Sequence, residues 1–229
     1  MENIAIYDTH NLTMEDKLTT EDKIAEKLLS IGAIQINVKN PFTWVSGIKS
    51  PIYCDNRQIN SNVAVRDLVV CAFVDFIHNI EGVDIIAGVA TGGIPLGTLI
   101  ADRLKLPFIY VRSEPKKHGL MKQVEGYFKK GDKVILIEDH ISTGSSSMKA
   151  IKGLKEAGLD LICLISNMTY GFDKAEKLFN DEGIKHYSIC NLETILKSAV
   201  RAGIINEDEK NQVIKFKSSP ETWYDNLKS

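Results

Sequence analysis

The feature that most constrains the fold is an alternation of apolar runs and helical segments. The apolar runs cover residues 83–90, 107–111, 134–137 and 159–166, and a further run at 186–189 can add a fifth strand. Helical spacing is found between these runs, over residues 94–104, 145–157 and 174–182. Apolar strands separated by helices are typical of a parallel sheet that is covered on both faces. The sequence therefore predicts an α/β fold, with ligands bound at the carboxyl ends of the strands.

Further elements are expected ahead of this alternation. Thr20 is predicted to cap a helix that stops at Gly32, and residues 34–38 can form a short strand. Residues 40–60 mix aromatic side chains, glycine and proline, which indicates a structured loop or hairpin. Residues 63–80 have the periodicity of an amphipathic helix.

Composition limits the classes of function. The chain has 229 residues, of which 44% are hydrophobic, and its net charge is −2. This balance gives no general attraction to nucleic acid or to anionic membranes. The N-terminus lacks the pattern of a secretory signal and no apolar stretch is long enough to span a bilayer, so we expect a cytosolic protein. The cysteines, Cys54, Cys71, Cys163 and Cys190, are expected to be buried free thiols.

The most informative segment is residues 134–147. Its apolar run ends in Glu138 and Asp139, and a turn rich in hydroxyl groups and glycine then leads into a helix. Free backbone N–H groups and the positive end of the helix make such a turn suitable for a phosphate monoester. Carboxylates would repel phosphate, but they can accept hydrogen bonds from vicinal hydroxyls. The segment therefore predicts a ribose 5-phosphate site. Walker and dinucleotide-binding glycine patterns are absent from the sequence.

This segment resembles the signature of type I phosphoribosyltransferases that binds 5-phosphoribosyl-1-diphosphate (PRPP). The resemblance implies a central parallel sheet flanked by helices and a small N-terminal hood. It also implies that Glu138 and Asp139 face the ribose hydroxyls, with a Mg²⁺ ion bound through PRPP nearby. The residues implied to bind PRPP in this segment are Glu138, Asp139, His140, Ile141, Ser142, Thr143, Gly144, Ser145 and Ser146.

The loop after residue 90 is rich in glycine and opens a helix. Glycines let a backbone approach a ligand closely and donate its N–H groups. Taken alone, the loop could also be a tight packing turn. The family resemblance implies a pyrophosphate-binding loop, in which Thr91 and Gly92 contact PRPP.

The loop after residue 111 holds a dense basic cluster, residues 112–119. Cations placed over a leaving pyrophosphate stabilise its developing charge, although a solvated surface turn would have a similar composition. The cluster resembles the catalytic loop of orotate phosphoribosyltransferases. That resemblance implies that Arg112, Lys116 and His118 contact the pyrophosphate, that they act in catalysis together with Asp139, and that the loop is shared across a homodimer.

Residues 42–57 resemble the orotate-side signature of the same family. Lys49 and Arg57 can pair with a carboxylate, and Tyr53 can stack on a planar ring. The resemblance adds Ser142 as an orotate contact. A structural hairpin with scattered charges is the alternative interpretation of this stretch.

The resemblance divides the chain into three parts. Residues 1–60 form the leader and the hood segment on the base side, residues 61–190 form the PRPP-binding core, and residues 191–229 are C-terminal helices packed on the same domain. Several side chains are expected to have no catalytic role: His10, His78 and His186 at the surface or as caps, and Trp44 and Trp223 as packing aromatics. His140 occupies a variable position of the signature and is not expected to bind metal.

The implied activity is transfer of the phosphoribosyl group of PRPP to orotate, which gives orotidine 5′-phosphate and pyrophosphate in pyrimidine (UMP) biosynthesis. Two alternatives stay open. One is a phosphoribosyltransferase that acts on a purine, against which residues 42–57 argue. The other is a regulator that binds PRPP without turning it over. Such a regulator can carry a basic DNA-binding region, which the acidic N-terminal stretch does not resemble.

Overall fold

The structure is a computed structural model that describes residues 18–44, 46–112 and 123–228. Its centre is a six-stranded sheet in the order β10-β9-β8-β5-β6-β7. The strands are β5 (Ile85–Val89), β6 (Phe108–Val111), β7 (Val124–Glu125), β8 (Lys133–Ile141), β9 (Asp160–Thr169) and β10 (His186–Asn191). All neighbours pair in parallel except β6 and β7, which are antiparallel. The predicted parallel α/β sheet is confirmed, and the short edge strand β7 was not predicted.

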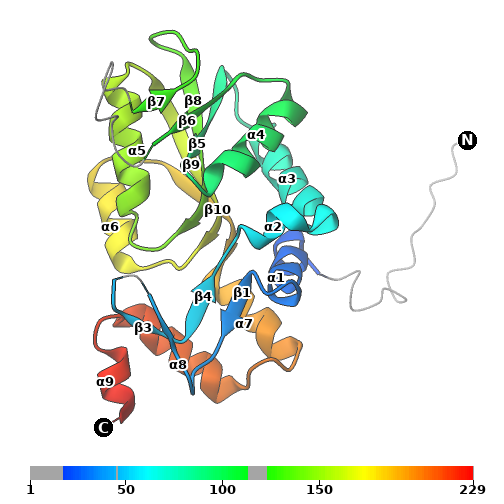
Figure 1. Cartoon of the computed structure of the whole chain (residues 1–229), viewed down its shortest axis with the longest axis vertical. Coiled ribbons are helices and arrows are strands. Elements are labelled where there is room, and N and C mark those ends of the chain that lie inside the picture. The colour runs from blue at the N-terminus through cyan, green and yellow to red at the C-terminus, as the bar shows by residue number, and fades with distance from the viewer. Residues whose placement is uncertain (1–17, 45, 113–122, 229) are drawn as a thin grey trace, which may run out of the picture.

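Helices cover both faces of this sheet (Figure 1). On one side lie α3 (Val63–Ile77) and α4 (Gly93–Leu104), and on the other α5 (Ser145–Glu156) and α6 (Asp173–Asp181). The side chains of the strands alternate between these two layers. Ile86 and Ile135 belong to the core cluster on the α3 side, whereas Ile85 and Leu136 belong to the cluster on the α5 side. Strands buried on both faces explain why the sequence shows nearly continuous apolar runs.

Two helix ends differ from the sequence-based expectation. The N-cap of α1 (Thr20–Ser30) is Thr19 and not Thr20, because the Thr19 hydroxyl accepts from the N–H of Asp22 and the Asp22 carboxylate accepts from the N–H of Thr19. Helix α3 ends at Ile77, three residues before the predicted end at Ile80. Periodicity alone does not locate such ends, because a capping hydrogen bond or a single turn of backbone decides them.

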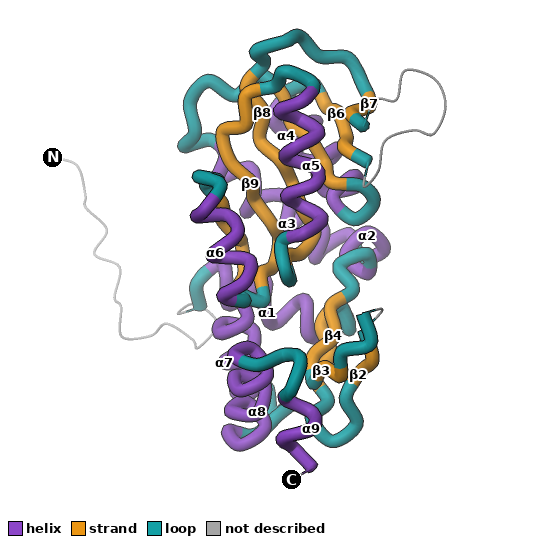
Figure 2. The backbone as a smooth tube through the Cα atoms, turned by 90° about the vertical axis from the view of Figure 1, so that its left-hand side faces the viewer, coloured by secondary structure: helices purple, strands orange, loops and turns teal. Residues whose placement is uncertain are grey.

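A smaller lobe lies beyond the carboxyl ends of the strands (Figure 2). Its hood segment contains two antiparallel pairs, β1 (Ile34–Ile36) with β4 (Ile52–Cys54) and β2 (Phe42–Thr43) with β3 (Lys49–Ser50), followed by the short helix α2 (Gln58–Ser61). The C-terminal helices complete the lobe. They are α7 (Leu192–Arg201), α8 (Glu207–Ser218) and α9 (Trp223–Lys228), and α8 and α9 lie beside the hood strands.

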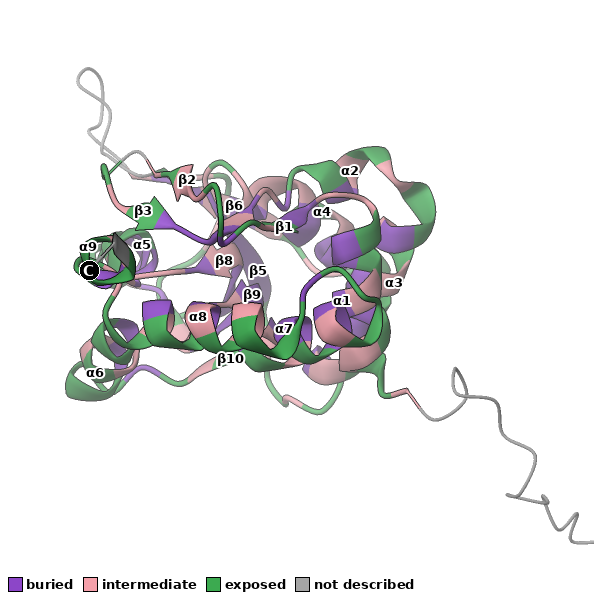
Figure 3. Cartoon of the chain, turned by 90° about the horizontal axis from the view of Figure 1, so that it is seen from below, coloured by how far each residue is buried: buried purple, intermediate pink, exposed green. Residues whose placement is uncertain are grey.

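An aromatic cluster joins this lobe to the end of β9. The ring of Trp44 packs edge-on against Tyr170 and Phe216, with centroid distances of 5.4 and 5.7 Å. Phe216 in turn packs against Trp223, which is buried. The predicted packing role of both tryptophans is therefore confirmed. Seen from below, β5 and β9 are buried at the centre of the molecule, while the outer side of α6 is exposed (Figure 3).

Three of the four cysteines are buried as predicted, and none forms a disulfide. The prediction is wrong for Cys71, which is exposed, because it lies on the outward side of α3. Among the described residues, no helix is both long enough and apolar enough to cross a membrane.

Candidate active site

A cavity of about 490 Å³ lies where the hood segment meets the carboxyl ends of β5 and β8 and the residue after β9. This is the sheet edge at which the sequence places the ligand site. The described residues that line the cavity come from the hood segment (Thr43, Trp44, Tyr53, Cys54, Asp55 and Arg57), from the loop after β5 (Thr91 and Gly92), from the end of β8 (Asp139, His140 and Ser142) and from Tyr170.

The end of β8 differs from the prediction. The sequence suggests that the strand stops at Ile137, but β8 continues through both acids and pairs with β9 as far as Ile141 opposite Thr169. The apolar run ends earlier because Glu138 is hydrogen-bonded to Ser147 and the next two residues, Asp139 and His140, line the cavity. Since side chains alternate along a strand, Glu138 and Asp139 lie on opposite sides of it. The two acids therefore have different environments.

Glu138 is turned into the protein. Its side chain is 3% exposed, and its Oε2 accepts a hydrogen bond of 3.0 Å from the hydroxyl of Ser147 on α5. Burial, and then the neighbouring charge of Asp139, raise the pKa of Glu138 well above its ordinary value. Glu138 is not among the residues that line the cavity. It joins the strand end to the helix that follows.

Asp139 lines the cavity and is the better candidate for direct contact with a ligand. Burial tends to raise the pKa of its carboxyl, but the interactions with His140 outweigh this and lower the pKa. His140 Nδ1 lies 3.2 Å from Asp139 Oδ2, an ion-pair distance without hydrogen-bond alignment, and the backbone N–H of His140 donates to Asp139 Oδ1 at 2.9 Å. Burial tends to lower the pKa of His140, and the carboxylate raises it overall. The carboxylate is therefore ionised at neutral pH.

Two buried amides hold the backbone at this point, and the sequence-based reasoning missed both. Asn56 Nδ2 donates to the carbonyl oxygen of Asp139 at 2.6 Å, and Asn167 Nδ2 donates to Asn56 Oδ1 at 3.2 Å. Asn56 is 3% exposed and Asn167 is fully buried. The chain of hydrogen bonds connects the hood segment to β8 and β9. A buried asparagine within the apolar run of β9 was the signal that could have indicated it.

The loop after β5 packs directly onto Asp139. A Cβ atom built on Gly92 would overlap the carboxylate of Asp139, so a side chain at position 92 would displace that group. The peptide bond between Ala90 and Thr91 is cis. The structure thus brings together Thr91, Gly92 and Asp139, which the sequence analysis selected from two separate motifs.

The turn from Ser142 to Ser146 carries the expected features of a phosphate loop. Gly144 has a φ of +76° and is the N-cap of α5, and its close packing on Phe179 leaves no room for a side chain. The hydroxyls of Thr143 and Ser145 lie 3.2 Å apart. The first N–H groups of a helix have no acceptor within it, so the start of α5 leaves donors for an anion. Ser142 is the residue of this turn that lines the cavity.

The hood side of the cavity is aromatic with one charged pair. Tyr53 packs on Phe42 at 5.6 Å, and Arg57 Nε lies 2.6 Å from Asp55 Oδ1. The predicted orotate contacts Tyr53, Arg57 and Ser142 all line the cavity, whereas Lys49 is not among its described lining residues. Lys49 Nζ instead donates to the hydroxyl of Thr43, at 2.6 Å.

The basic loop is described only at its start. Arg112 is exposed after β6, and its Nη1 lies 3.8 Å from Glu125 Oε1 on β7. It does not line the cavity. Lys116 and His118 lie outside the described residues, so their predicted contacts stay predictions.

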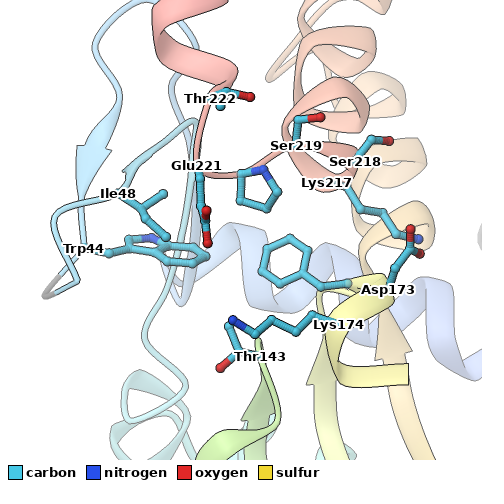
Figure 4. A pocket seen from close by; sticks show the side chains of 12 residues that line it. Trp44, Ile48, Thr143, Asp173, Lys174, Lys217, Ser218, Ser219, Glu221 and Thr222 are labelled. Atoms are coloured by element: carbon cyan, nitrogen blue, oxygen red, sulfur yellow. The ribbon is translucent and has the colours of Figure 1, made fainter. Parts of the chain in front are cut away.

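A second cavity, of about 370 Å³, also has Trp44 in its wall (Figure 4). Ile48, Thr143, Lys174, Lys217 and the turn between α8 and α9 line it. Trp44 therefore lines both hollows, one of which contains Asp139 and the other Thr143 of the phosphate loop.

No group of three or more His, Cys, Asp or Glu side chains within the described part of the chain could hold a metal ion. His140 has Asp139 as its acidic neighbour. His78 is the exposed C-cap of α3, as expected. His186 is mostly buried, and its Nε2 lies 3.0 Å from Glu176 Oε2. The surface or capping role predicted for His186 is therefore wrong, because its side chain packs between β10 and α6.

Known proteins resemble this chain in sequence and in fold. Residues 58–196 match the family model of the phosphoribosyl transferase domain. The chain is 44% identical over 206 residues to the orotate phosphoribosyltransferase of Phocaeicola vulgatus, a match that covers 90% of this chain and 97% of that protein. The chain belongs to the orotate phosphoribosyltransferase family.

Solved structures of this family have the same fold. The orotate phosphoribosyltransferase of Aeropyrum pernix superposes with a TM-score of 0.68 at 29% identity, over 80% of this chain and 99% of that one. Leishmania donovani UMP synthase superposes with a TM-score of 0.74 at 26% identity over 87% of this chain, which corresponds to 42% of that longer chain. The predicted type I fold and family are thus confirmed.

Proposed function

We propose that the protein transfers the 5-phosphoribosyl group of PRPP to orotate and releases pyrophosphate, which forms orotidine 5′-phosphate in UMP biosynthesis. The observation that carries this proposal is the composition of the 490 Å³ cavity. It joins an ionised acid and a glycine loop to an aromatic wall supplied by the hood segment. Membership of the family supports the choice of this reaction.

PRPP is assigned to the core side of the cavity. We assign the ribose hydroxyls to Asp139, whose carboxylate lines the cavity and accepts hydrogen bonds. The 5-phosphate is assigned to the turn of residues 142–146, since the start of α5 supplies N–H donors there. The pyrophosphate is assigned to the backbone of Thr91 and Gly92. Glu138 holds the end of β8 to the start of α5, because it accepts a hydrogen bond from the Ser147 hydroxyl.

Orotate is assigned to the hood side. Tyr53 offers its ring to a planar pyrimidine, and Arg57 supplies a cation. Arg57 is partly neutralised by Asp55. Ser142 lines the same cavity and can contact either substrate. Lys49 is not among the described residues that line the cavity. Its Nζ donates a hydrogen bond to the hydroxyl of Thr43, which does line it, so Lys49 is a candidate for an indirect role in orotate binding.

A Mg²⁺ ion would fit this site if it arrives with PRPP. The carboxylate of Asp139 is ionised and lines the cavity, and oxygen ligands of this kind suit Mg²⁺. Glu138 is buried against Ser147 and is a poorer candidate, although it lies next to Asp139 along the strand. When bound, the ion would neutralise charge on the pyrophosphate.

The reaction needs no covalent nucleophile from the protein. A ring nitrogen of the base attacks the anomeric carbon as the bond to pyrophosphate breaks. The leaving group takes the electron pair, and the proton of that ring nitrogen passes to the pyrophosphate or to solvent. The protein positions the two substrates and stabilises charge. Lys116, His118 and Arg112 are proposed to stabilise the departing pyrophosphate, with the loop of residues 112–119 shared between the subunits of a homodimer. The cytosolic location likewise stays a prediction from the sequence.

The test is a direct assay. The protein is mixed with Mg²⁺, PRPP and orotate, and the loss of orotate absorbance is followed. Turnover with a purine base but not with orotate would overturn the proposal in favour of a purine enzyme. Binding of PRPP without turnover of any base would indicate a regulator.

A loop variant tests the charge-stabilising role. Lys116→Ala is expected to lower kcat strongly, because removal of a group that acts on developing charge costs about 100-fold or more. Full activity in this variant would contradict the role given to the loop.

A further inference from the structure

Tyr170 is a buried wall residue of the cavity that no motif selected. It follows the last residue of β9, and its backbone N–H donates to the carbonyl of Ile141 at 2.9 Å, which fixes it to the end of β8. Only 2% of the residue is exposed, yet it lines the same cavity as Asp139 and Tyr53. Its position therefore combines near-complete burial with access to the substrate space.

Three rings hold the phenol in one orientation. Phe172 stacks on it with a centroid distance of 5.4 Å and an interplanar angle of 18°. Trp44 and His140 pack at steep angles to it, with centroids at 5.4 and 6.2 Å. A ring held on three sides cannot turn its hydroxyl to another partner without disrupting this packing. The hydroxyl therefore has a fixed place in the wall.

That hydroxyl makes no hydrogen bond to any residue that the structure describes, although the backbone N–H of Tyr170 is bonded. Its oxygen is not one of the described buried side-chain atoms left without a partner, which fits a hydroxyl that reaches the cavity, where a ligand can accept from it. Burial raises the pKa of Tyr170 well above its ordinary value, so the phenol stays protonated at neutral pH. The cavity wall thus holds a neutral O–H donor that lacks an acceptor.

We propose that the Tyr170 hydroxyl donates a hydrogen bond to the ring carboxylate of the pyrimidine acceptor and thereby determines specificity for a carboxylated base. This inference rests on the proposed function and adds a residue to it. Trp44, which packs on Tyr170, belongs to the hood segment on the base side. Arg57 lines the same cavity and supplies a cation, which its ion pair with Asp55 partly neutralises, so a neutral donor adds to the binding of an anion there. An anionic acceptor also makes a stronger hydrogen bond than a neutral one.

The test is Tyr170→Phe, which removes the oxygen and keeps the ring. We expect the KM for orotate to rise by about tenfold to a hundredfold, the range for loss of a hydrogen bond to a charged group. The KM for PRPP and kcat should stay within about threefold. Tyr187→Phe is the matched control, since Tyr187 is partly exposed on β10 and packs on Phe76, and it should change none of these constants.

A second ligand distinguishes the carboxylate from the ring. Competitive inhibition by 6-methyluracil, which has a methyl group in place of the carboxylate, should be the same in the wild type and in Tyr170→Phe. If Tyr170→Phe weakened the binding of 6-methyluracil as much as the binding of orotate, the assignment of the hydroxyl to the carboxylate would be overturned. An unchanged KM for orotate, or an equal rise in the KM for PRPP, would overturn the specificity role. A wild type that does not turn over orotate would overturn the proposed function itself, so the two failures are distinguishable.

Discussion

Replacement of Asn56 by alanine is expected to destabilise the protein and to loosen the hood segment. Asn56 donates to the carbonyl of Asp139 at 2.6 Å and accepts from Asn167 at 3.2 Å, and both asparagines are almost fully buried. Alanine removes both hydrogen bonds at once. Two groups, the Asp139 carbonyl and the Asn167 amide, would then be left without a partner in a buried region.

The size of the effect follows from these two groups. Leaving one buried polar group unpaired costs about 1–3 kcal/mol, so two would cost about 2–6 kcal/mol. The removed amide no longer has to be desolvated in the folded state, and water can reach part of the space, which reduces the loss. We expect the free energy of unfolding to fall by about 2–4 kcal/mol.

Urea unfolding followed by two signals measures this. Far-ultraviolet circular dichroism reports on the whole chain. Tryptophan fluorescence reports on the smaller lobe, because Trp44 and Trp223, the two tryptophans of the sequence, both lie there. In Asn56→Ala the midpoint of the fluorescence transition should move to a lower urea concentration, by at least as much as the midpoint of the circular dichroism transition.

The control is Asn60→Ala, in the short helix α2 that follows Asn56. The side chain of Asn60 makes no hydrogen bond to a described residue, so this variant should stay within about 0.5 kcal/mol of the wild type. A loss in Asn56→Ala no larger than that of Asn60→Ala would refute the reasoning. It would mean that the two amides do not hold the hood segment to the strand ends.

Two further predictions concern the acids. Gly92→Ala places a Cβ atom on the carboxylate of Asp139 and displaces that group. Because a displacement of about 1 Å in a catalytic site lowers the rate by about 100-fold, we expect kcat/KM for PRPP to fall by that order. The melting temperature should change little. Glu138 has a pKa raised above its ordinary 4.5, so the folded state binds its proton more tightly and the stability that depends on this group falls as pH rises above that value. Glu138→Gln should remove this fall, so that the unfolding free energy of the variant relative to the wild type increases as the pH of the urea titrations is raised above 4.5. A difference that stays constant with pH would contradict the burial of an acid at this position.

The sequence predicted the sheet because its strands are buried on both faces. Residues such as Ile86 and Leu136 lie in different core layers but are equally apolar, so the runs were visible without knowledge of the fold. Strand β7 was not visible, since two residues carry no period and its pairing with β6 depends on tertiary context.

The site residues that could be predicted are those in which a functional group belongs to a contiguous sequence motif. Asp139, Gly92 and Ser142 belong to contiguous motifs, and the structure places all three at one cavity. The different environments of Glu138 and Asp139 could not be predicted, because they depend on the continuation of β8 beyond the apolar run.

The residues that were missed share one property. Asn56, Asn167 and Tyr170 act through partners that are distant along the chain, as the hydrogen bond from Asn56 to Asp139 shows. A single sequence carries no record of such pairs. Buried polar side chains within apolar segments are the remaining trace of them, and the amide of Asn167 in β9 is the clearest example.

The measurement that tests the central claim most directly is a steady-state assay of the full chain with Mg²⁺ and PRPP, in which orotate, uracil, adenine and hypoxanthine are compared as acceptors. Formation of pyrophosphate and orotidine 5′-phosphate with orotate, at a kcat/KM far above that of the other three bases, is the predicted result. Equal or greater turnover of a purine, or no pyrophosphate with any base despite PRPP binding, would contradict it.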